Sequence, residues 1–129
     1  MLTVNRVRQA YRRIKLRPAS DVYFDESQGA CCPTIAVCLA ERRLSRAEVA
    51  AAMSPTQVAG ALGESTLYLT AFIDSVNRWH TTGWTQQARF YERPLPRDAD
   101  AALRLMWRGW RDGERVGRAL LGPLPRRRH

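Results

Sequence analysis

Three cysteines and His80 are the residues whose types could support covalent chemistry. Cys31 and Cys32 are adjacent and directly precede a predicted helix, and a helix N-terminus lowers the pKa of a thiol. With His80 as its base, either thiol could act as a nucleophile. The sequence offers no identifiable carboxylate to orient that histidine and no oxyanion donor. We therefore predict that the protein is not an enzyme and has no catalytic residues.

The same side chains, together with Cys38, could be considered as zinc ligands. Zinc sites commonly contain C-x-x-C spacing, whereas two of these three cysteines are adjacent, which is an awkward geometry for one metal ion. An odd number of cysteines also gives no disulfide framework. No P-loop, dinucleotide fingerprint, paired carboxylates or H-E-x-x-H pattern is present. We predict small buried or half-buried thiols, with no metal and no cofactor.

Charge is the distinctive property of this sequence. Its 129 residues include 21 basic and 12 acidic side chains, which gives a net charge of +9 and a pI near 10.7, and all but one of the basic residues are arginines. Residues 1–17 hold six basic and no acidic side chains, and residues 106–129 hold seven and two, whereas residues 31–88 are balanced. Such segregation attracts anionic partners, although a solvated tail and helix face would give the same pattern without one.

The first basic segment has the pattern of an amphipathic helix that begins after Thr3 and ends before Pro18. An apolar stripe at helical spacing would dock this helix on the core. The stripe lacks the bulky apolar side chains of a membrane-surface helix, which favours a protein or nucleic-acid partner. The candidate partner-binding residues here are Arg6, Arg8, Arg12, Arg13 and Arg17.

The second basic segment lies in a long predicted helix that Asp98 caps and that ends near Leu121. Glycines recur every four residues in it, at Gly109, Gly113 and Gly117, and each costs about 1 kcal/mol inside a helix. Close approach of another helix would compensate for that cost, and we favour this packing over a partner surface. The candidate partner-binding arginines of this helix are Arg108, Arg111, Arg115 and Arg118.

Trp107 and Trp110 alternate with those arginines and allow two interpretations. An exposed tryptophan would anchor a protein partner or stack on a single-stranded nucleic acid. In the alternative, which we favour, both rings belong to the core and their neighbouring arginines face water.

Shorter elements are expected between the two basic segments. Helices are predicted from Pro33 to Arg43, after Ser45, after Ser54 and from Ser65 through His80, with residues 84–97 as a connector. The segment 18–30 is predicted to be a loop. Its apolar run 22–24 either pairs as a short strand or inserts into the core and holds the loop in place. The two helices after Ser45 and Ser54 suggest a DNA-binding helix-turn-helix, but the usual glycine-containing turn between them is missing. We therefore favour two helices that pack against the core and do not bind DNA.

These elements predict an all-α fold with about five to six helices in a single compact domain, residues 1–122, followed by a basic flexible tail, residues 123–129. The N-terminus lacks the apolar region of a secretion signal, and no window holds the roughly 20 apolar residues that a membrane span needs. Together with the cysteine usage, this predicts a cytoplasmic protein.

Two segments resemble known groups of proteins. "GACCPTIAVCLAERRL" followed by "YLTAFIDSVNRW" resembles small helical accessory proteins of bacterial phages and mobile elements, a group that includes anti-CRISPR proteins. That resemblance implies a non-enzymatic inhibitor of a host defence complex, although many anti-CRISPR proteins are acidic and this chain is basic. "RGWRDGERVG" resembles the R-G-aromatic pattern of ribosome modulation factors, which are small basic RNA-associated proteins.

The sequence therefore predicts a non-enzymatic binding protein that engages a nucleoprotein complex through its arginine-rich helices. Its partners would be protein subunits of such a complex. The alternative is a regulator or ribosome-associated protein that binds DNA or RNA directly through the same arginines.

Overall fold

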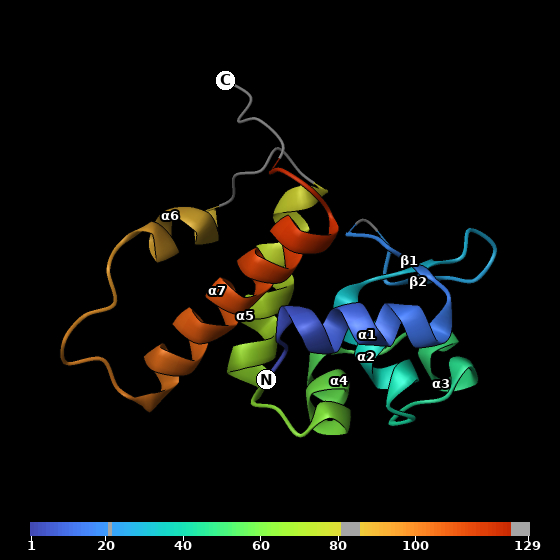
Figure 1. Ribbon diagram of the computed structural model, residues 1–129. Helices are drawn as coiled ribbons and strands as arrows, with labels where there is room; N and C mark the ends of the chain where they lie inside the picture. Colours follow the sequence, from blue (N-terminus) through green and yellow to red (C-terminus); the bar gives the residue numbers. More distant parts are fainter. Residues whose placement is uncertain (21, 81–85, 125–129) are drawn as a thin grey trace.

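The structure, a computed structural model, describes residues 1–20, 22–80 and 86–124. The elements that dominate this part of the chain are helices (Figure 1). They are α1 (Val4–Ile14), α2 (Pro33–Ala40), α3 (Arg46–Ala50), α4 (Pro55–Leu62), α5 (Thr66–Val76) with the 3-10 turn η1 (Asn77–Trp79), α6 (Gln86–Glu92) and α7 (Ala101–Leu120).

A small three-stranded sheet accompanies the helices, so the all-α prediction is wrong in its strict form. β3 (Ala30–Cys31) lies in the middle, parallel to β1 (Arg17–Pro18) and antiparallel to β2 (Phe24–Asp25). Each strand is only two residues long, too short for the alternating pattern that identifies strands in a sequence. The pairing of β1 with β3 joins residues 13 positions apart in the chain and is therefore a tertiary feature.

Local capping signals locate several helices correctly. The Ser45 hydroxyl accepts from the Glu48 amide while the Glu48 carboxylate accepts from the Ser45 amide, and Ser54 and Gln57 form the same reciprocal pair. Gly63 ends α4 at φ 68°, a left-handed conformation that glycine adopts at little cost. Such caps satisfy amides that the helix leaves unbonded, so the sequence alone determines them.

Other helix boundaries differ from the predicted ones. α1 ends at Ile14, because Lys15 is left-handed, and α2 ends at Ala40 rather than Arg43. α7 is capped by Asp100, whose carboxylate accepts from the Leu103 amide at 2.9 Å, and not by Asp98. α5 ends at Val76, and His80 follows η1 as an exposed residue.

α6 occupies part of the segment expected to be a connector. Its seven residues are too few for a stable isolated helix, so its formation depends on packing. Tyr91 stacks on Trp110 with ring centroids 4.5 Å apart, and Phe90 and Tyr91 both contact Trp107. Gly83 and Trp84, which the prediction placed near this connector, and the basic residues 126–128 lie outside the described residues.

The glycines of α7 serve close helix packing, as predicted. α5 and α7 lie side by side (Figure 1). A Cβ on Gly109 would overlap the carbonyl of Tyr68, and one on Gly113 would lie 2.6 Å from the carbonyl oxygen of Phe72. Both helices repeat these contacts every four residues, so their backbones touch along the shared face.

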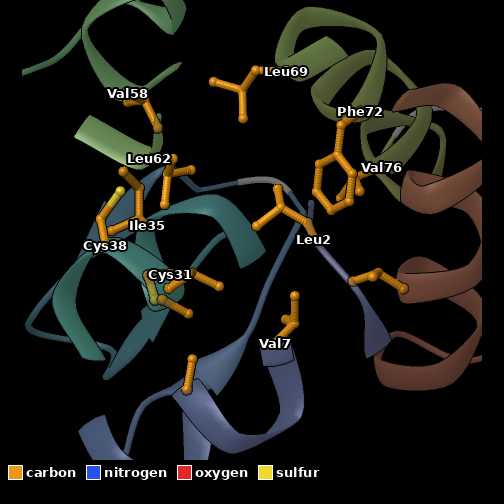
Figure 2. Close-up of a cluster of buried hydrophobic side chains, with 14 of the residues drawn as sticks. Leu2, Val7, Cys31, Ile35, Cys38, Val58, Leu62, Leu69, Phe72 and Val76 are labelled. Atoms are coloured by element: carbon orange, nitrogen blue, oxygen red, sulfur yellow. The ribbon is translucent and has the colours of Figure 1, made fainter. Parts of the chain in front are cut away.

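The main core lies where α1, α2, α4 and α5 meet. Leu2, which precedes α1, is fully buried, and Figure 2 shows its side chain near Phe72 and Val76 of α5. Complete burial of a leucine contributes about 1.5–3 kcal/mol. A polar link crosses the same region, because the Tyr68 hydroxyl accepts from the Leu2 amide at 2.9 Å and donates to Asp112 at 2.5 Å. This network fixes α1 against α5 and α7.

Candidate anion-binding face

Exposed arginines follow one side of α7 from end to end. Their spacing of four, three, four and three residues places them within an arc of about 80°, at about 100° per residue. The row extends over about 21 Å at 1.5 Å per residue. We call this row the α7 arginine face; it consists of Arg104, Arg108, Arg111, Arg115 and Arg118, all exposed.

Burial of the rest of α7 forces this face outward. Trp107 and Trp110 are only 4% and 5% exposed, and Val116 is fully buried. The two tryptophans therefore belong to the core, which confirms the favoured interpretation. Their alternative use as exposed anchors for a partner is wrong, because the packing of α6 covers both rings.

Part of the α7 arginine face carries charge that no side chain in the described part of the protein neutralises. Arg115 pairs with Asp112 at 3.3 Å, and Arg118 lies 4.0 Å from Glu114. Within the described residues, neither Arg108 nor Arg111 has a hydrogen bond or an ion pair. The middle of the face is thus available to an anion from outside.

The structure separates the five arginines predicted as one basic surface near the N-terminus. Arg6 donates to both carboxylate oxygens of Glu41, at 2.6 and 2.7 Å, and so joins α1 to α2. Arg8 is half-buried, whereas Arg12 and Arg13 are exposed. Arg17 was expected on the helix, but it lies in β1 because α1 ends three residues earlier.

The Arg6–Glu41 pair predicts a specific pH dependence of stability. The guanidinium lowers the pKa of Glu41 to about 2 from its ordinary value of 4.5. The stabilisation is therefore complete above pH 4.5 and is lost as the pH falls towards 2. Because the pair is partly exposed, we expect E41Q to lower the free energy of unfolding at pH 7 by only about 0.5–1 kcal/mol.

Urea denaturation of both proteins between pH 7 and pH 3 measures this effect. The difference between wild type and E41Q should narrow below pH 4.5. A difference that stayed constant to pH 3 would contradict the assigned role of the pair.

Three exposed arginines were not among the predicted partner-binding residues: Arg104, Arg42 and Arg43. Arg104 is part of the α7 row, and the 4-3-4-3 spacing would have revealed it. Arg42 lines a shallow depression with Arg13 where the C-terminal ends of α1 and α2 meet. This second basic area is a product of helix packing, because its two arginines are 29 positions apart in the chain.

The three cysteines do not form an activated thiol site. Burial raises the pKa of Cys31 and of Cys38 to about 12, and it also raises the pKa of Cys32. Cys32 and His80 do line one cavity of about 370 Å³, but the Cys32 sulfur contacts the Thr34 hydroxyl at 3.2 Å. The expected effect of the α2 N-terminus on thiol pKa is therefore outweighed by desolvation.

Alkylation kinetics test this account of the thiols. We expect all three cysteines to react with iodoacetamide at pH 7.5 at least tenfold more slowly in the native protein than in 6 M guanidinium, because a thiol must ionise before it reacts. Cys32, the least buried by accessible surface, should be the fastest. Native Cys32 reacting faster than in the unfolded chain would instead support a thiol nucleophile.

The described residues contain no cluster of three histidine, cysteine or acidic side chains suited to a metal ion. None of the helices in the same part of the chain is long and apolar enough to cross a membrane. Comparison with known protein families, with curated proteins and with solved structures finds no match to this chain. A functional proposal for this protein therefore has to be argued from the arrangement of its own side chains.

Proposed function

We propose that the protein is a non-enzymatic binder of nucleic-acid phosphates and that the α7 arginine face makes the contact. The single observation that carries this proposal is the row of five exposed arginines, two of which have no hydrogen bond or ion pair with any described residue. Guanidinium groups pair with phosphate oxygens through two parallel hydrogen bonds. Along the roughly 21 Å of the row, a DNA duplex carries about twelve phosphate charges.

Burial of the tryptophans favours contacts to the backbone over contacts to bases. With Trp107 and Trp110 in the core, α7 offers no ring on which an unpaired base could stack. Phosphate contacts alone carry no sequence information. We therefore expect binding that is strongly dependent on salt and nearly independent of sequence.

A second candidate function is inhibition of a host defence complex encoded by a mobile element. The resemblance of residues 29–44 and 68–79 to phage accessory proteins, including anti-CRISPR proteins, favours it. In that case the α7 arginine face would meet an acidic surface of a protein subunit, or phosphates held within the complex. A role at the ribosome, suggested by residues 108–117, would use the same face on RNA phosphates.

A salt series of binding separates these candidates. The affinity for random duplex DNA and single-stranded RNA would be measured by fluorescence anisotropy, starting at about 50 mM salt, where non-specific electrostatic binders remain bound. The proposal predicts a linear fall of log K with log salt concentration. Absence of binding at the lowest salt concentration would reject direct nucleic-acid binding and favour a protein partner.

A further inference from the structure

A groove on another side of the molecule combines apolar side chains with one carboxylate. Along α5, Leu67, Thr70, Ala71 and Asp74 share one helix face, because they are spaced by three, one and three residues. α6 forms the opposite wall of the groove, which holds about 410 Å³. The residues that α6 and α7 add to the lining are Gln87, Phe90, Tyr91 and Met106.

Exposed apolar surface is concentrated at this groove. Leu67 and Phe90 are 43% and 44% exposed and border it from opposite walls. Among the described residues, Met1 is the one other large hydrophobic side chain in the exposed class. Isolated exposed apolar side chains are ordinary, but two that line the same groove from different helices form an apolar patch of the kind that marks an interaction site.

Asp74 gives the groove a negative charge with which no cation of the described residues pairs. It is half-buried and has no hydrogen bond or ion pair within the described residues, and burial raises its pKa. The buried and half-buried acids of α7 differ from Asp74 in this respect. Asp112 and Glu114 of α7 each pair with an arginine. Among the described residues no arginine pairs with this carboxylate, so it is open to a cation from outside.

We propose that this groove binds a protein segment that presents a lysine or arginine between apolar side chains. The apolar side chains would cover Leu67 and Phe90, and the cation would pair with Asp74. Desolvation of an unpaired carboxylate is costly, so a cation that arrives with the covering segment offsets the cost. A phosphate ligand is disfavoured here, because the carboxylate repels it. The groove is thus a second surface, and it does not depend on the function proposed for α7.

Two matched synthetic helical peptides test this proposal. One carries two leucines and a lysine on the same face, and the other has glutamine in place of that lysine. Amide chemical shifts of the isotope-labelled full chain would report where each peptide binds. We expect the lysine peptide to shift residues of the groove and to bind at least tenfold more tightly than the glutamine peptide.

Variants separate the role of the carboxylate from general charge. D74N should abolish the preference for the lysine peptide, whereas D98N makes the same charge change at an exposed site outside the groove and should retain it. The melting temperature of D74N should not fall, because the substitution removes a half-buried charge. A retained preference in D74N overturns the proposal.

Three other results of the peptide titrations would also contradict the proposal. Equal affinities of the two peptides, or shifts that map outside the groove, overturn the proposal. If groove residues shift with protein concentration in the absence of peptide, the occupant is a second copy of this chain, and the proposed partner is wrong.

Discussion

The triple substitution R108Q/R111Q/R118Q is expected to weaken binding to random duplex DNA by about 100-fold near 0.1 M salt. Each phosphate contact contributes about 0.9 to the slope of log K against log salt concentration, so the magnitude of that slope should fall by about 2.7. The three side chains are exposed and are not essential to an internal ion pair, since Glu114 keeps its contact with Arg78 at 2.9 Å. The fold should therefore be unaffected.

A control triple variant removes the same charge elsewhere. R89Q/R93Q/R97Q alters three exposed arginines of α6 and the segment that follows it, outside the α7 arginine face. We expect it to lower affinity by less than tenfold through the change in net charge alone. If anisotropy titrations show equal losses for the two variants, the α7 arginine face is not the binding surface, and binding reflects overall charge.

Replacement of Gly109 by alanine is expected to lower the free energy of unfolding by about 2–3 kcal/mol. The new Cβ would overlap the Tyr68 carbonyl, and a backbone group of α5 cannot rotate away as a side chain could. Overpacking of this kind costs about 1–3 kcal/mol or more, which exceeds the gain of about 1 kcal/mol from replacing glycine in a helix. Thermal unfolding should show a melting temperature lower by about 10 °C.

The same substitution at Gly60 is the matched control and should have the opposite sign. Gly60 is inside α4, is exposed and has no atom near the position of a Cβ. G60A should therefore raise the free energy of unfolding by about 0.5–1 kcal/mol. If G109A were as stable as G60A, α5 and α7 would not pack as closely as described.

The sequence predicts features that depend on near neighbours in the chain. The capping pairs at Ser45 and Ser54, the end of α4 at Gly63 and the apolar stripe of α1 all involve residues within one or two helical turns. The glycine spacing of α7 also indicated helix packing, because glycine is costly in a helix unless something approaches closely. The predominance of helices and the row of arginines in α7 could likewise be predicted from the sequence.

Tertiary structure alone decided which of these side chains remain available to a partner. Arg6 and Arg13 both lie on α1, yet Arg6 is bound to Glu41, the residue that caps the C-terminal end of α2. The three-stranded sheet, α6 and the burial of Trp107 likewise depend on contacts between distant segments, which residue spacing does not encode.

The two candidate sites also differ in how far the sequence alone predicts them. The α7 arginine face is a property of one helix, so its 4-3-4-3 spacing can be found in the sequence once the helix is located. The groove around Asp74 is formed by three helices, and within the described part of the chain no arginine reaches its carboxylate. Local sequence sets which side chains share a helix face, whereas packing sets what each face meets, because partners come from distant parts of the chain.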